Sequence, residues 1–122
     1  MAIAVLEDYH TLGKKIVSAF LRANGFKIID YGHGMTVDNL VQRTKEDKIE
    51  ILMISTLMLP SALKVKDVRQ RLHDEGCDVK IVVCGAPFLF DSELWKEVQA
   101  DAMGENASRA VEIMNTMMGR IN

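Results

Sequence analysis

Long apolar runs and a charge excess of either sign are both missing from this 122-residue sequence. Its 15 Lys and Arg residues stand against 17 Asp and Glu residues, and a formal net charge of -2 gives no electrostatic reason to expect binding to nucleic acid or an anionic membrane. No apolar stretch approaches the roughly 20 residues that a membrane-spanning helix needs. Glu7 and Asp8 follow the first apolar run directly, where a signal peptide would carry a cleavage site. We therefore expect a soluble, cytoplasmic protein.

Cysteine is scarce, and two common phosphate-binding signatures are absent or incomplete. The two cysteines, Cys77 and Cys84, are expected to be free thiols, because two thiols are ordinary in a reducing compartment and Cys84 ends an apolar run. The sequence contains no G-x-x-x-x-G-K-[ST] phosphate loop, and Gly32-x-Gly34 is too short for a dinucleotide fingerprint. These absences disfavour nucleotide-binding functions of the common kinds.

Short β-branched runs alternate with longer segments of helical period along the whole chain. This alternation is typical of a parallel sheet with helices on both faces. With 48% hydrophobic residues the chain can build one core. We predict a single flavodoxin-like α/β domain over residues 1–122, a doubly wound five-stranded parallel sheet. The predicted strands are 2–6, 27–31, 50–55, 79–84 and 101–103, and the predicted helices are 13–24, 36–47, 60–76, 91–99 and 106–118.

In such a sheet, ligands bind beyond the carboxyl ends of the strands, where the winding reverses. Four segments follow the first four predicted strands: 8–13, 31–35, 55–61 and 85–88. We expect the functional site among them. His33 also lies at this edge, although its flanking glycines are more typical of an exposed turn.

His10 lies two residues after Asp8 in the first of these segments. A carboxylate so placed can hydrogen-bond one imidazole nitrogen, fix the tautomer and make the other nitrogen a better metal ligand. Gly13 would let the backbone turn tightly into the following helix. The same residues are also compatible with a surface loop in which Asp8 caps a helix and His10 is solvated.

The pattern Asp8-x-His10-x-x-Gly13 after the first strand resembles the cobalamin-binding domain shared by methionine synthase, corrinoid methyltransferase proteins and the carbon-skeleton mutases. The resemblance extends over nearly the whole chain. It implies a cobalamin or related corrinoid as cofactor, with His10 as the lower axial ligand of cobalt in place of the cofactor's own dimethylbenzimidazole. Asp8 would orient His10, and Thr11 and Leu12 lie within the same motif.

Further signatures of this family concern the slot for the nucleotide tail of the cofactor. Ser55-Thr56-Leu57 is similar to the family's Ser-x-Leu, which implies that Ser55 and Leu57 line the slot. Ser61 has the spacing of a serine that completes a His–Asp–Ser relay in methionine synthase. Asn106, in Asn106-Ala107-Ser108-Arg109, resembles the turn that borders the tail.

The sequence departs from the family pattern at two places. The family usually has Gly-Gly after the fourth strand, whereas this chain has Cys84-Gly85-Ala86-Pro87, which implies a narrowed slot next to Gly85 and Ala86. Leu59 stands where relatives often carry a Thr that hydrogen-bonds the buried base. One polar contact to the tail would then be missing, worth about 1 kcal/mol.

The resemblance leaves the reaction open. A methyl carrier, with cobalt passing a methyl group between partner methyltransferases, is favoured by Lys14-Lys15-Ile16-Val17 and by the Gly85-Ala86-Pro87 turn. The alternatives are the cobalamin-binding subunit of an adenosylcobalamin mutase and a non-enzymatic cobalamin carrier or sensor. Only seven residues precede Asp8, so we expect no helical cap domain, and a partner subunit would cover the upper face of the cofactor. A phosphoacceptor receiver domain is disfavoured because the third strand ends in Ile54-Ser55 instead of an acidic residue.

Overall fold

The computed structural model describes residues 1–6 and 12–119, with only the backbone of Leu12 and Gly13 described. In this part of the chain five strands form one parallel sheet in the order β2-β1-β3-β4-β5. The order is that of flavodoxin-like folds, so the predicted fold class is confirmed. The strands are β1 (Ala2–Val5), β2 (Ile29–Asp30), β3 (Ile51–Ser55), β4 (Lys80–Cys84) and β5 (Ala102–Met103).

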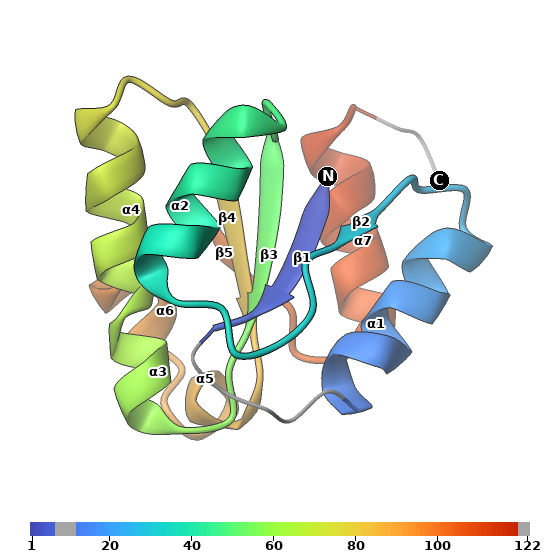
Figure 1. The fold of residues 1–122 in the computed structure, drawn as a ribbon. Helices are drawn as coiled ribbons and strands as arrows, with labels where there is room; N and C mark the ends of the chain where they lie inside the picture. The colour runs from blue at the N-terminus through green and yellow to red at the C-terminus, as the bar shows by residue number, and fades with distance from the viewer. Residues whose placement is uncertain (7–11, 120–122) are drawn as a thin grey trace.

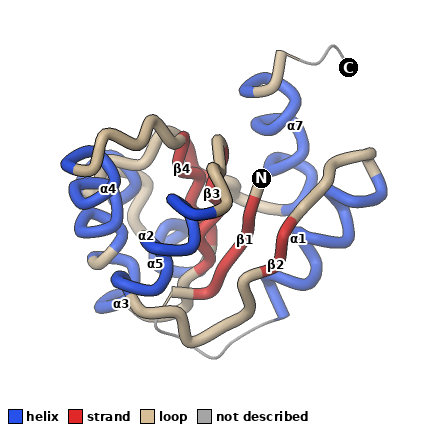
Figure 2. Tube along the Cα trace, turned by 45° about the horizontal axis from the view of Figure 1, so that its top comes forward, coloured by secondary structure: helices blue, strands red, loops and turns tan. Residues whose placement is uncertain are grey.

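Helices cover both faces of the sheet (Figure 1). Helices α1 and α7 lie on one face and α2 and α4 on the other, and a turned view shows the same three layers (Figure 2). None of the helices in the described residues has the length and apolar character that crossing a membrane requires. The helices are α1 (Leu12–Ala23), α2 (Val37–Glu46), α3 (Leu59–Leu63), α4 (Val65–Asp74), α5 (Ala86–Phe90), α6 (Leu94–Glu97) and α7 (Ala107–Met117).

The central strands are apolar because they are buried on both faces. Residues of alternating orientation enter two separate cores: Leu52 and Ile54 of β3 pack on the side of α2 and α4, and Met53 packs on the side of α1 and α7. The second core is completed by Leu21 of α1 and Met114 of α7. The parallel sheet thereby fixes the carboxyl ends of β1, β3 and β4 at one edge.

The helix predicted over 60–76 is wrong as one continuous element. The structure has two helices, α3 and α4, which meet at Lys64. The Lys64 N–H bonds the carbonyl of Ser61, only three residues back, at 3.1 Å, so the helix axis is interrupted by a tight turn. The predicted helix 91–99 is also too long, because only α6 is helical there.

A short helix, α5, was not predicted, although the sequence carries a sign of it. Gly85 precedes the helix and Pro87 lies in its first turn, a position that proline favours. The side chain of Phe88 is fully buried, so α5 is packed onto the sheet. This helix closes the carboxyl edge beside β4.

The helical period of the sequence predicts that Ile16, Phe20 and Met118 lie on the apolar faces of their helices, but all three side chains are half-exposed. Ile16 and Phe20 of α1 are 47% and 45% exposed, because Val17 and Leu21 form the face that packs on the sheet. Met118 is 48% exposed and follows the last residue of α7, past the helix face that holds Met114. Both cysteines are free, as predicted.

Candidate functional site

A largely apolar pocket of about 290 Å³ opens at the carboxyl edge of the sheet, between α1 and the start of α7. It is built from the helix that follows β1, from the ends of β3 and β4, from α5 and from the turn between β5 and α7. The lining residues are Ile16, Val17, Ser55, Cys84, Gly85, Leu89, Gly104, Glu105, Asn106 and Ala107. Four of the residues predicted from the sequence therefore meet in one pocket: Ser55, Cys84, Gly85 and Asn106.

Ser55 and Cys84 contribute the two small polar side chains from the strands. They are register partners at the ends of β3 and β4, and both are buried. Burial raises the pKa of the Cys84 thiol to about 11, an effect that a hydrogen bond with Ser55 only partly offsets. The thiol is consequently neutral at physiological pH, and it donates to the Ile54 carbonyl at a sulfur–oxygen distance of 3.8 Å.

Gly85 holds the two loops at this edge in close contact. Its φ of 115° lies in a region that side chains disfavour, and a Cβ atom there would lie 1.7 Å from the carbonyl oxygen of Thr56. The Thr56 N–H in turn donates to the Cys84 carbonyl at 3.1 Å. The hydroxyl oxygen of Thr56 is buried and has no hydrogen-bond partner among the described residues. Only glycine fits this position, so Gly85 shapes the site through its backbone.

Asn106 forms the rim of the pocket and the N-cap of α7. Its side-chain oxygen accepts the Arg109 N–H at 2.8 Å, a bond that fixes the orientation of the amide and the start of the helix. Neighbouring Glu105 is the one charged residue among the described residues that line the pocket. The interior is therefore suited to a neutral, flat and mostly apolar group.

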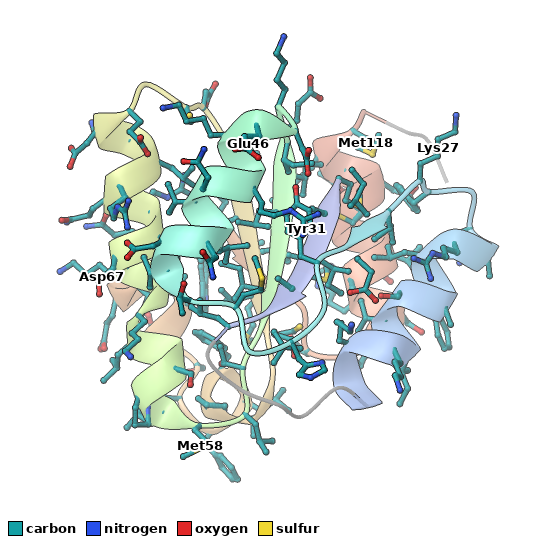
Figure 3. All side chains as sticks on the ribbon, viewed as in Figure 1. Lys27, Tyr31, Glu46, Met58, Asp67 and Met118 are labelled. Carbon is teal, nitrogen blue, oxygen red and sulfur yellow. The ribbon has the colours of Figure 1, made fainter. Side chains whose placement is uncertain are left out.

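Three other predicted residues, Leu57, Leu59 and Ala86, lie in an adjacent pocket of about 330 Å³. This pocket lies between the loop after β3 and α5. Half-exposed or exposed apolar side chains lie along the loop after β3, α3 and α5, and Figure 3 shows one of them, Met58, projecting away from the ribbon at this edge. We call these residues the apolar rim: Leu57, Met58, Leu59, Leu63, Leu89 and Phe90.

The remaining predicted residues are not brought together by the described structure. Ser61 is buried in α3 and lines neither pocket. Asp8, His10 and Thr11 lie outside the described residues, and Leu12 and Gly13 begin α1. The relay of His10, Asp8 and Ser61 therefore stays a prediction. Within the described residues no group of three or more His, Cys, Asp and Glu side chains could hold a metal ion, and His33 is exposed.

The part of the pocket that comes from helices and from the last turn was not predicted from the sequence. These residues are Ile16, Val17, Leu89, Gly104, Glu105 and Ala107. Apolar residues in an amphipathic helix usually lie in the core, so the helical period alone does not indicate that Ile16 and Val17 line a pocket. One feature of the sequence could have indicated this role: both residues lie in the second turn of the helix that starts at the ligand edge.

The residues present fit the tail of a corrinoid cofactor. The pocket is apolar, and it carries a hydroxyl from Ser55, a neutral thiol from Cys84 and a glycine at the closest backbone approach. The chain matches the family described as the B12 binding domain over residues 1–113. The chain belongs to this family. The prediction of a cobalamin or related corrinoid cofactor is confirmed at the level of the family.

Relatives with curated names agree with the family assignment. The chain is 36% identical over 107 residues to dimethylamine corrinoid protein 1 of Methanosarcina acetivorans, covering 85% of this chain and 49% of the relative. It is 37% identical over 116 residues to monomethylamine corrinoid protein 1 of Methanosarcina barkeri, covering 91% of this chain and 52% of the relative. The chain thus spans about half the length of the curated relatives it matches.

Solved structures show the same fold. The monomethylamine corrinoid protein of Methanosarcina barkeri matches with a TM-score of 0.86 at 34% identity, covering 96% of this chain and 57% of that one. A cobalamin-binding protein from Desulfitobacterium hafniense matches with a TM-score of 0.85 at 27% identity, covering 94% of this chain and 58% of that one. Both are similar over almost the entire sheet and its helices.

Proposed function

We propose that this chain is the corrinoid-binding unit of a methyl carrier that serves partner methyltransferases. The observation that carries the proposal is the apolar pocket between α1 and α7, found in a chain whose relatives are named methylamine corrinoid proteins. A bound corrinoid would supply the chemistry, since its cobalt accepts and releases a methyl group. The relatives' names favour a methyl carrier over a mutase subunit.

The pocket would hold the nucleotide tail. Its walls from α1 and α7 would enclose a flat base, and Ser55 and Cys84 would offer a hydroxyl and a thiol to its polar atoms. Burying an apolar ring gains about 25 cal/mol for each Å² removed from water, so the apolar wall is the main source of affinity. Asn106 and Glu105, at the turn before α7, would border the sugar and phosphate part.

His10 would bind the cobalt of the corrinoid, and Asp8 and, more remotely, Ser61 would orient its imidazole. The position of the segment in the chain supports this assignment. It joins β1, whose carboxyl end lies at the ligand edge, to α1, whose second turn lines the pocket. A histidine in this segment is therefore linked on both sides to elements, β1 and α1, that border the proposed site.

The apolar rim would contact either the corrin ring or a partner protein that covers the bound cofactor. Phe90 is 90% exposed, and Met58, Leu59 and Leu63 are at least half exposed. Clusters of this kind often mark a binding surface. Leu57 would contribute to it from the loop after β3 and Leu59 from the start of α3, while Ala86, at the start of α5, would line the pocket beside it. We propose a methyltransferase as the covering partner.

The test is methylation of the loaded protein in a reconstituted system. The protein would be loaded with hydroxocobalamin, reduced, and incubated with methylamine methyltransferases and their mono-, di- or trimethylamine substrates. We expect one of these substrates to give the absorption spectrum of the methylated corrinoid, dependent on both enzyme and substrate. If the protein holds the corrinoid and no methyltransferase acts on it, the methyl-carrier proposal is wrong while corrinoid binding stands.

A further inference from the structure

Lys14, in the first turn of α1, is a buried lysine that pairs with the carboxylate of Asp30. Its ammonium group is 2.7 Å from Oδ1 and 2.8 Å from Oδ2 of Asp30, and its side chain is only 5% exposed. Asp30 ends β2 and is 34% exposed, and its Oδ1 also accepts the Gly32 N–H at 2.7 Å. The pair joins the start of α1 to the end of β2.

The location of this lysine is electrostatically unfavourable in two ways. A buried ammonium group loses its hydration, and lysines are rarely buried unless they are paired. The first turn of a helix also carries the positive end of its dipole, and α1 has no acidic residue in that turn. The contact with Asp30 must offset both effects, so the pair constrains where α1 begins.

Asp30 is charged at neutral pH and is suited to this role. Burial alone opposes its ionisation, but the hydrogen bonds from Lys14 and Gly32 and the charges of Lys14 and Arg22 outweigh it and hold the pKa of Asp30 below its ordinary value. A charged carboxylate that accepts three hydrogen bonds is a defined anchor point.

The other end of segment 7–11 is anchored on the same loop. The Val5 N–H donates to the Gly32 carbonyl at 2.9 Å, the Met35 N–H donates to the Val5 carbonyl at 3.2 Å, and Leu6 forms an isolated parallel bridge with Met35. Lys14 binds Asp30 immediately before this loop. Figure 1 shows the connection between β2 and α2 passing the end of β1.

We propose that Lys14 and Asp30 are positioning residues that hold the start of α1 so that His10 can reach the cobalt of a bound corrinoid. The inference rests on the proposed function. The chain contacts the stretch from Asp30 to Met35 on both sides of segment 7–11. Leu6, just before the segment, forms a bridge with Met35, and Lys14, shortly after it, binds Asp30. A fixed span lowers the entropy lost when His10 binds the metal. Without this ion pair, ligation by His10 weakens more than total corrinoid binding does, because neither Lys14 nor Asp30 lines the pocket.

The experiment compares Lys14→Met and Asp30→Asn with the wild-type chain, each saturated with hydroxocobalamin. The visible spectrum separates corrinoid bound with histidine on the cobalt from corrinoid bound without it, and equilibrium dialysis measures total binding. We expect the ratio of histidine-bound to histidine-free corrinoid to fall about tenfold in either variant, a change within the range for coupled pairs. The double variant should be no worse than the single ones, because the two residues act through one contact.

Lys45→Met is the matched control, since it breaks the Lys45–Glu75 pair of 3.2 Å on the surface between α2 and α4. It should leave the ratio at the wild-type value. Circular dichroism shows whether each variant is folded. If Lys14→Met does not fold, Asp30→Asn still gives the answer, because the side chain of Asp30 is partly exposed and its replacement disturbs the core less. A wild-type ratio in a folded Asp30→Asn variant would overturn the positioning role. A wild-type chain that binds corrinoid without histidine on the cobalt would instead overturn the proposed ligation, and the positioning role with it.

Discussion

The Cβ position of Gly85 lies 1.7 Å from the carbonyl oxygen of Thr56, so the loops after β3 and β4 touch through their backbones. Gly85 lines the pocket between α1 and α7, and its neighbour Ala86 lines the adjacent pocket. A side chain at Gly85 would push the loops apart and alter both pockets. The contact thus connects the fold of the carboxyl edge to the shape of the pocket that we propose for the cofactor tail.

Gly85→Ala should destabilise the protein by at least about 2 kcal/mol, because it combines a positive φ with a backbone clash. Gly104→Ala is the matched control in the same pocket. Its Cβ would meet Ala110 at 3.5 Å, an ordinary contact, so we expect a change below about 1 kcal/mol. Urea unfolding of both variants measures the difference. Equal stability of the two variants would show that the close contact between Gly85 and Thr56 does not exclude a side chain at position 85.

Cys84→Leu should weaken cobalamin binding about tenfold or more, because a larger side chain overfills the pocket that the tail would occupy. Binding of cobinamide, a corrinoid without the nucleotide tail, should be unchanged. Cys77→Ala, at the other free cysteine, serves as the control. Isothermal titration with both corrinoids gives the comparison. Parallel loss of cobalamin and cobinamide binding would place the tail elsewhere.

Stability at alkaline pH should depend on Cys84. Burial raises its pKa to about 11 from an ordinary value of 9.0, so the unfolded chain releases the thiol proton first as the pH rises. The stabilisation is fully present below pH 9 and is lost as the pH rises toward 11, by on the order of 3 kcal/mol. Unfolding free energies measured against pH for the wild type and Cys84→Ala isolate this effect. Parallel curves for the two proteins would contradict it.

The sequence was sufficient for the fold class and for part of the site. Alternating apolar and amphipathic segments predicted the five parallel strands, and parallel strands bring their carboxyl ends to one edge. Ser55, Cys84 and Gly85 could therefore be placed together without knowing the structure. Asn106 was predicted from its resemblance to the turn that borders the tail, and the structure makes it the N-cap of α7.

Other features depend on three-dimensional contacts that no local pattern carries. The break at Lys64 and the half-exposed position of Ile16 follow from how the helices pack on the sheet. The sequence suggested that Gly85 makes space for the tail, and only the structure shows that Thr56 also forbids any side chain there. The paired burial of Lys14 and Asp30 joins residues 16 positions apart and has no sequence signature.

Replacement of His10 by alanine tests the central claim most directly. The wild-type protein mixed with cobalamin should show a base-off spectrum with histidine bound to cobalt, which requires both a tail in the pocket and a histidine at the metal. We expect His10→Ala to lose the histidine-bound spectrum while dialysis shows that the corrinoid is still retained through the pocket. A His10→Ala protein with the wild-type spectrum would show that His10 is not the ligand of the cobalt.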